Sequence, residues 1–228
     1  DMIGQVIEGL RFVWNNRLLL GAISLDLFAV LLGGAVYLLP IFANDIIDIA
    51  AIGLAPEQAL GWLRAAPAVG ACAMAIVLAY MPPFKRSGPV LFWCVAGFGV
   101  ATIGFGFSTN FWLSMVMLAL VGALDNVSMV IRQVIVQMAT PNAMRGRVSS
   151  VNAIFVGSSN EIGGFESGLV ARLTNPVISV VSGGIGTIFV VLAWARVFPS
   201  LRELGSLSSL SELRQQAEQQ AKAGSKPV

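Results

Sequence analysis

Residues 111–139 read FWLSMVMLALVGALDNVSMVIRQVIVQMA, a long apolar segment with charged residues inside it. The hydrocarbon core of a bilayer is roughly 30 Å thick, so a spanning helix needs about 20 mostly apolar residues. This segment is long enough to cross a membrane. Asp125 and Arg132 lie well inside it, and charge in hydrocarbon is costly. Such residues normally face the interior of a helix bundle or a water-filled path.

Five further segments of the chain have a similar length and an apolar character. They are residues 18–43, 61–82, 89–108, 148–171 and 175–197. The whole chain is 56% hydrophobic and 11% charged, whereas about 25% of the residues in an ordinary soluble domain are charged. We therefore predict an all-α membrane protein with a bundle of six transmembrane helices over residues 18–197.

The two ends of the chain have a different character from this bundle. Residues 2–17 carry apolar side chains at helical spacing, which predicts a cytoplasmic helix along the membrane surface or, alternatively, a linker helix. Residues 198–228 form the other flank, and within it 206–228 are rich in Ser, Gln and Ala. That composition predicts a cytoplasmic tail that is partly disordered. Because the chain begins Asp1-Met2, we expect Asp1 to be an internal position of a longer protein.

Basic residues fall unequally on the two sides of the predicted bundle. Positive charge in short loops marks the cytoplasmic side of a membrane protein. With a cytoplasmic N-terminus, eleven Lys and Arg residues lie inside and two, Arg64 and Arg172, lie outside. The inner set is Arg11, Arg17, Lys85, Arg86, Arg145, Arg147, Arg196, Arg202, Arg214, Lys222 and Lys226. Both ends of the chain are therefore predicted to be cytoplasmic.

Several classes of function have no support in the composition. The chain has no histidine, which excludes His-based triads, relays and metal sites within it. Cys72 and Cys94 are far apart and form no CxxC motif, so they are predicted to be buried small apolar residues of the bundle. No basic stripe with interleaved aromatics indicates nucleic acid, and no Walker loop indicates ATP hydrolysis. We expect no enzyme activity, no metal and no cofactor, with an intramembrane enzyme as the remote alternative.

The loop at residues 139–151, ATPNAMRGRVSSV, carries the most specific motif of the chain. Its elements are Pro141 after a threonine, then Arg145, Gly146 and Arg147 before a helix that begins with serine. This loop resembles the cytoplasmic loop between helices 10 and 11 of major facilitator superfamily transporters. The branch it resembles contains enterobactin exporters and drug or macrolide efflux proteins. The segments EGLRF at 8–12, LPIF at 39–42 and RQ at 132–133 are similar to that branch as well.

The resemblance implies a fold and a function for the whole chain. It implies helices 7–12 of a twelve-helix transporter, built as two inverted three-helix repeats over 18–108 and 111–197, with an N-terminal six-helix half as its partner. It also implies secondary active, proton-coupled efflux of a small or medium-sized, partly apolar molecule across the inner membrane. The loop at 82–89 departs from the superfamily's gating motif because it lacks the acidic member. It serves either as a gate or, more simply, as a positive-inside anchor.

Five polar residues of the spans are candidates for the substrate or proton pathway. Asp26 and Arg132 lie about 10–12 Å from the same face of the bilayer, so they either form an ion pair or reach water separately. Asp125 and Glu161 lie about 21 Å deep, where the charged form of a carboxyl is disfavoured. Each is either a proton carrier or a polar packing contact, and Asn126 is placed to hydrogen-bond a substrate.

Other polar and small residues belong to the span at 148–171. Gly164 and Gly168 form a GxxxG pair, which is typical of close helix packing in membranes. Glu166 lies near the outer end and is expected to pair with Arg172 or to reach the outer interface. A non-transporting scaffold or receptor on the same fold is the second function that these residues allow. Loss of efflux on replacing the intramembrane carboxylates distinguishes a transporter from such a scaffold.

Overall fold

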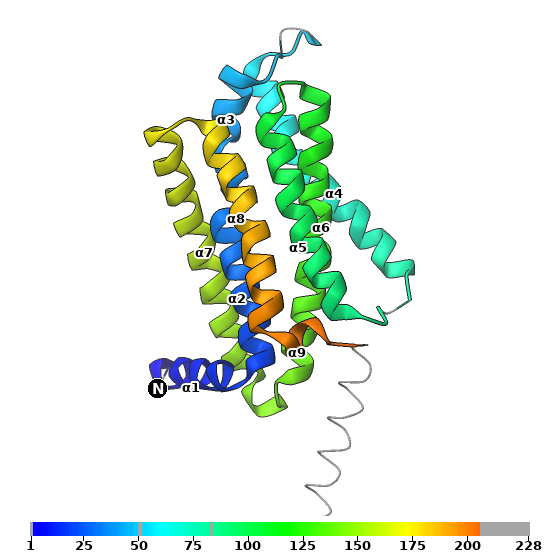
Figure 1. The fold of residues 1–228 in the computed structure, drawn as a ribbon, viewed down its shortest axis with the longest axis vertical. Coiled ribbons are helices and arrows are strands. Elements are labelled where there is room, and N and C mark those ends of the chain that lie inside the picture. The colour runs from blue at the N-terminus through cyan, green and yellow to red at the C-terminus, as the bar shows by residue number, and fades with distance from the viewer. Residues whose placement is uncertain (1, 50–51, 83, 206–228) are drawn as a thin grey trace, which may run out of the picture.

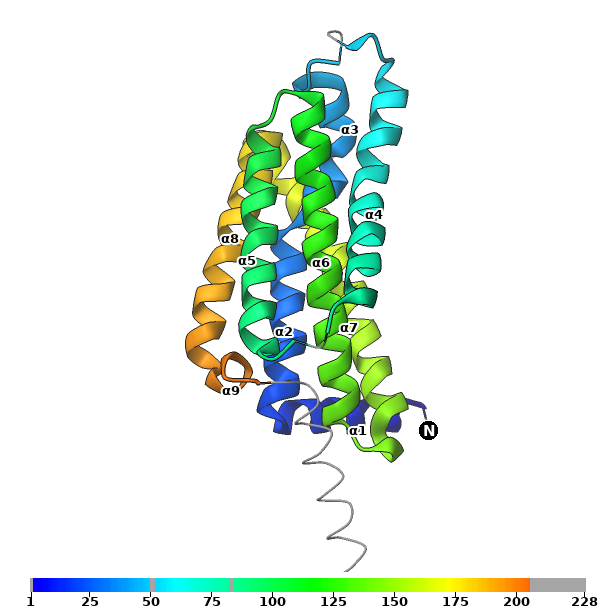
Figure 2. The same ribbon diagram turned by 90° about the vertical axis from the view of Figure 1, so that its right-hand side faces the viewer.

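The computed structural model describes residues 2–49, 52–82 and 84–205, and these residues form a bundle of long helices (Figures 1 and 2). The first helix, α1 (Met2–Asn15), lies outside this bundle, across its lower end in Figure 1. The bundle helices are α2 (Arg17–Leu32), α4 (Pro56–Tyr80), α5 (Ser87–Phe107), α6 (Phe111–Ala139), α7 (Arg145–Leu173) and α8 (Pro176–Val197). The predicted tail at 206–228 lies outside the described residues.

The first predicted span, 18–43, is a helix that changes its winding along its length. After α2, the chain continues through a 3₁₀ turn η1 (Gly34–Leu38), a short α3 (Leu39–Ile41) and a π-helical turn η2 (Phe42–Ile46). Gly33 and Gly34 mark the change, because a Cβ on Gly33 would lie 2.6 Å from the Phe98 ring and one on Gly34 would clash with Ser167. Close approach of neighbouring helices at this glycine pair therefore accompanies the altered winding.

Five helical segments of the described residues are long and apolar enough to cross a membrane. They are Arg17–Ile46, Pro56–Tyr80, Ser87–Phe107, Phe111–Ala139 and Pro176–Val197. The remaining long helix, α7, is as long as α6, at 29 residues, but it is more polar. It is not among these five segments. The regular structure of the described residues is thus all-helical, as predicted, and five of the six predicted spans meet this criterion.

The helices pack in an interleaved order rather than in sequence order. Helix α4 lies against α6, α5 lies between α6 and α8, and α2 lies between α7 and α8. Two glycines set the contact between α4 and α6: a Cβ on Gly70 would clash with the carbonyl of Ala119, and one on Gly122 would clash with the carbonyl of Pro67. Small residues at such crossings let two backbones approach closely.

All segments predicted to be cytoplasmic that the structure describes lie at one end of the bundle (Figures 1 and 2). This end holds α1, the connection between α4 and α5, the loop between α6 and α7, and a short helix α9 (Pro199–Arg202). Pro199 begins α9, directly after the end of α8. The segment after α9 caps the N-terminus of α5. The backbone N–H of Ser87 donates to Gly205 O at 3.0 Å, and that of Gly88 donates to Leu204 O at 3.1 Å.

Helix α1 is held on the bundle by packing and by one ion pair. Val13 is buried in a cluster with Val136, Val148 and Val151, from α6 and α7. Another side of α1 leaves Trp14 and other apolar side chains exposed. An exposed apolar edge is compatible with a position along the membrane surface, which stays a prediction for this helix.

Candidate functional site

Asp26 of α2 and Arg132 of α6 form an ion pair inside the bundle. The Nη1 of Arg132 contacts the Oδ2 of Asp26, and the two side chains are only 7% and 11% exposed. Their surroundings are apolar, since Leu25, Ile131 and Val95 belong to the same buried cluster. Of the two arrangements left open by the sequence, the structure therefore has the pair.

Hydrogen bonding at this pair is incomplete. The Nε of Arg132 is buried and has no hydrogen-bond partner among the described residues. A guanidinium carries five N–H donors, so Asp26 alone does not satisfy it. An incompletely satisfied buried charge is costly, and a site that keeps one is a candidate for a functional role.

Asp125 lines a cavity of about 330 Å³ whose walls come from α2, η1, α4, α5, α6 and α7. Asn160 of α7 is a second polar side chain of this cavity, and Tyr37 and Phe98 supply aromatic surface. Asp125 thus lines a cavity rather than a sealed core, and its role in a pathway stays a prediction. Tyr37 and Asn160 were absent from the predicted site residues, although Tyr37 is the one aromatic hydroxyl of the first span.

A narrow gap connects the neighbourhood of Asp125 with that of the ion pair. Asp26, Asp125 and Ser128 all line this gap, together with Val30 and Phe98, which also line the larger cavity. Asp125 and Arg132 are seven residues apart on α6, which is two helical turns or about 10 Å on one face. The acid and the ion pair therefore occupy one continuous line along α6.

The other two predicted pathway residues lie apart from this line. Glu161 is exposed on α7 and does not line the cavity, because its neighbour Asn160 takes that position. Asn126 has a buried Oδ1 with no partner among the described residues, and it does not line the cavity either. The structure thus brings Asp26, Arg132 and Asp125 together, and it brings neither Glu161 nor Asn126 to them.

The glycine pair of α7 is not the place where its backbone meets α2. A Cβ on Gly163 would lie 2.8 Å from Leu31 O, so this neighbouring glycine makes the close contact. Gly164 faces the ring of Tyr37, whereas a Cβ on Gly168 would meet nothing within 4 Å among the described residues. Glu166 accepts a hydrogen bond from the Ser167 hydroxyl at 3.5 Å, and no ion pair with Arg172 is present in the described part of the chain.

The loop motif between α6 and α7 combines a turn with an ion pair. Pro141 precedes the 3₁₀ turn η4 (Asn142–Met144), and Arg145 begins α7. Gly146 has open space around it, and Arg147 Nη1 lies 2.7 Å from Glu8 Oε2 of α1. The motif therefore ties α1 to the start of α7. In the other loop, Lys85 and Arg86 are exposed, which fits an anchoring role.

Among residues 2–49, 52–82 and 84–205, no group of three or more His, Cys, Asp or Glu side chains is placed to hold a metal ion. Cys94 is buried and Cys72 is exposed, so only the first has the buried position that we predicted for both.

Together, the long apolar helices and the line of buried charged groups are features of a multi-pass membrane protein. Comparison with curated proteins finds a similarity to exporters. The chain is 28% identical over 143 residues to Enterobactin exporter EntS of Escherichia coli O1:K1 / APEC, an alignment that covers 63% of this chain and 34% of the relative. The same identity over the same length is found with Enterobactin exporter EntS of Shigella flexneri, covering 35% of that relative.

The resemblance read from the loop motif is therefore confirmed, since the chain is similar to exporters of that branch. These relatives are named as exporters and not as enzymes, in agreement with the prediction. The aligned region spans about a third of the length of the curated relatives. No family model matches the chain, and no solved structure matches it.

Proposed function

We propose that this chain is one six-helix half of a secondary active transporter of the inner membrane, which exports a small or medium-sized molecule by proton-coupled alternating access. The observation that carries the proposal is the line from the Asp26–Arg132 ion pair to the cavity beside Asp125. Charged groups inside a membrane are costly and mark ion or substrate pathways. In this proposal α7 is the sixth span, with its polar side chains toward the pathway or a partner.

The packing order supports two three-helix repeats, α2–α4–α5 and α6–α7–α8. Helix α4 lies on α6 as α7 lies on α2, and α5 lies on α6 as α8 lies on α2. At the crossing of α5 and α8, a Cβ on Gly99 would lie 2.9 Å from Gly184 O, and a Cβ on Gly184 would lie 2.7 Å from Gly99 O. Exchanging the two repeats therefore reproduces these three contacts, as expected for related repeats, whereas the contact between α7 and α8 has no counterpart between α4 and α5.

Asp125 is the proposed proton carrier. A carboxyl between apolar walls favours its neutral form, so it takes up a proton when it faces the outside and releases it when it faces the cytoplasm. The neighbouring ion pair is the proposed gate, because separating Asp26 from Arg132 requires water or another counter-charge. Glu161, exposed on α7, and Asn126 are proposed to act toward substrate or toward the partner half.

The partner is a second, N-terminal six-helix half that closes the other wall of the pathway. Both ends of this chain are proposed to be cytoplasmic, since the end of the bundle with α1 and α9 carries most of the basic residues. The relatives are named for enterobactin export, so we propose a siderophore or a drug of similar partly apolar character as substrate. Tyr37 and Phe98 provide aromatic surface for such a molecule.

Enterobactin release from cells tests this proposal. The complete reading frame that contains this chain is expressed in a strain lacking its enterobactin exporter, and enterobactin in the medium is measured. Export should return with the wild-type sequence and fall at least tenfold with Asp125→Asn at equal membrane abundance. The exposed acid Glu57 supplies the control, and Glu57→Gln should export normally. Failure of the wild-type sequence to restore export would favour the scaffold function, and normal export by Asp125→Asn would contradict the proposed role of Asp125.

A further inference from the structure

A second cavity opens between α7 and α8, on the other side of α7 from the pathway. Its volume is about 370 Å³, and its walls come from α1, α2, α7 and α8. Nearly all lining side chains are apolar, among them Leu27, Phe28, Phe155 and Trp194. The Ser24 hydroxyl also faces it, and it accepts a hydrogen bond from Trp194 Nε1 at 2.9 Å. The cavity therefore offers an apolar ligand an almost uniformly apolar wall.

This cavity is separate from the proposed transport path. Helix α7 presents Phe155 to it and Asn160 to the cavity beside Asp125. Five residues along a helix correspond to about 140° of rotation, so the two side chains point to different sides of α7. No charged side chain lines the apolar cavity. It faces the region where a bilayer would surround the bundle.

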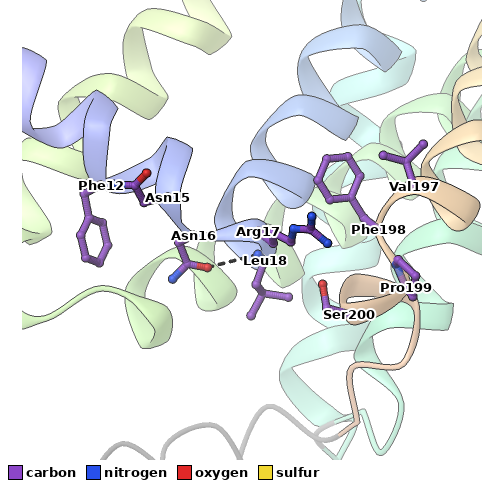
Figure 3. Close-up of a pocket in the computed structure, with 9 residues that line it drawn as sticks. All are labelled: Phe12, Asn15, Asn16, Arg17, Leu18, Val197, Phe198, Pro199 and Ser200. Atoms are coloured by element: carbon purple, nitrogen blue, oxygen red, sulfur yellow. Dashed lines mark hydrogen bonds between the residues drawn. The ribbon is translucent and has the colours of Figure 1, made fainter.

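A cationic pocket lies at the end of this cavity, where α1 joins α2 (Figure 3). Its volume is about 670 Å³, and Arg17, Asn15, Asn16 and Ser200 provide its polar side chains. No acidic residue lines it, and Arg17 makes no ion pair within the described residues. Figure 3 shows the Arg17 side chain extending toward Phe198, which lines both the pocket and the apolar cavity.

The spacing on α2 aligns the cation with the apolar wall. Arg17, Leu20, Ser24 and Phe28 follow one another at intervals of three or four residues, so they share one face of the helix. From Arg17 to Phe28 the helix rises about 16 Å. A cation at the interfacial end and an apolar stripe above it match a phosphate group joined to an acyl chain.

We propose that the cationic pocket and the apolar cavity, which share Phe198, form one lipid-binding groove, and that this groove binds an anionic phospholipid. The phosphate lies against Arg17 with Asn15 and Ser200 beside it, and one acyl chain runs along α2 past Trp194. An exposed groove within a bilayer is filled by lipid, and the unpaired guanidinium selects a headgroup with net negative charge over one that carries choline. Basic pockets at the cytoplasmic level of membrane helices recognise such headgroups.

Quenching of Trp194 fluorescence by brominated lipids tests this site. The chain is reconstituted with the exposed Trp14, Trp62, Trp93 and Trp112 replaced by Phe, so that Trp194 alone reports. Trp14 lines the cavity, and Phe keeps an aromatic apolar wall at that position. Vesicles contain phosphatidylcholine with either brominated phosphatidylglycerol or brominated phosphatidylcholine. One basic residue near an anionic surface contributes about 1 kcal/mol, which is about fivefold in binding. We expect phosphatidylglycerol to quench at about fivefold lower mole fraction than the choline lipid.

Two matched variants complete the experiment. Arg17→Gln should abolish the preference for phosphatidylglycerol, whereas Arg196→Gln, at an exposed arginine that lines neither cavity, should keep it. Helix content by circular dichroism shows that both variants are folded. Equal quenching by the two lipids in the wild-type protein would overturn the proposal by showing ordinary boundary lipid. Absence of quenching by either lipid would also overturn it, because the groove would then be covered by protein.

Discussion

Arg132 of α6 lies against Asp26 of α2, and the two side chains are 7% and 11% exposed. The residues are far apart in sequence, so their contact joins the two groups of three helices from which we propose the bundle is built. The cavity beside Asp125 begins next to this contact. The relationship therefore links stability of the bundle with the proposed pathway.

Removing one member of the pair should destabilise the bundle more than removing both. Breaking a buried ion pair leaves an uncompensated charge and costs about 3–5 kcal/mol. We expect Asp26→Asn and Arg132→Gln each to lower the free energy of unfolding by about that amount. The double variant should lose less than either single variant. Unfolding in mixed detergent micelles, followed by circular dichroism, measures all three against the wild-type protein.

Replacing Gly122 should separate α4 from α6. A Cβ on Gly122 would clash with the carbonyl of Pro67, and overpacking costs about 1–3 kcal/mol where the neighbours cannot move aside. Gly122→Ala should therefore lower the unfolding midpoint. Gly168→Ala is the control, because nothing described lies within 4 Å of the added Cβ. Equal midpoints for the two variants would show that α4 and α6 do not cross this closely.

Packing, rather than the Glu8–Arg147 ion pair, should hold α1 on the bundle. The Glu8 and Arg147 side chains are 55% and 33% exposed, and such pairs contribute about 0.2–1 kcal/mol. A Cβ on Gly9 would instead lie 2.8 Å from Arg147 O. Tryptic cleavage after Arg11 and Arg17 should accelerate strongly in Gly9→Ala and only slightly in Glu8→Gln.

The matched control for this helix is Gly4→Ala, at an exposed position of α1. It gains the same helix propensity as Gly9→Ala without the contact, so its cleavage should be no faster than in the wild-type protein. If Gly4→Ala and Gly9→Ala are cleaved at the same rate, α1 does not rest on the start of α7 as described.

The two ends of the bundle should face different compartments. Ser200 and Thr174 are exposed at opposite ends, and either becomes a single reporter after Ser200→Cys or Thr174→Cys in a chain whose own two cysteines are replaced by alanine. A membrane-impermeant maleimide added outside intact spheroplasts should label the variant at 174 and spare the one at 200. The reverse labelling would invert the proposed orientation.

Much of the helical pattern could be predicted from the sequence. Residues 111–139 coincide with α6, and 175–197 differs from α8 by one residue, because apolar length alone specifies a spanning helix. The altered winding after Leu32 was not predicted, since hydropathy stays high through 18–43. Only the glycine pair at 33–34 signals it, and its meaning depends on Phe98 and Ser167 from other helices.

The position of the site residues along their helices could be predicted from the sequence, but the direction in which their side chains point could not. Equal depths from one face placed Asp26 opposite Arg132, and the two side chains do meet. Depth also placed Asp125 and Glu161 together, yet Glu161 is exposed and Asn160 takes the cavity position. Neighbouring residues on a helix point about 100° apart, so the rotation of α7 decides which one lines the path. The rotation of α7 follows from its close contact with α2 at Gly163. The sequence pattern had instead predicted close helix packing at Gly164 and Gly168.

Transport in proteoliposomes is the most direct measurement of the central claim that Asp125 couples export to protons. The complete transporter is reconstituted with radiolabelled enterobactin, and both exchange across the membrane and net movement driven by a pH gradient are followed. Asp125→Asn should retain exchange and lose net movement driven by the gradient, because the amide cannot carry a proton. Net proton-driven transport by Asp125→Asn at the wild-type rate would contradict the account.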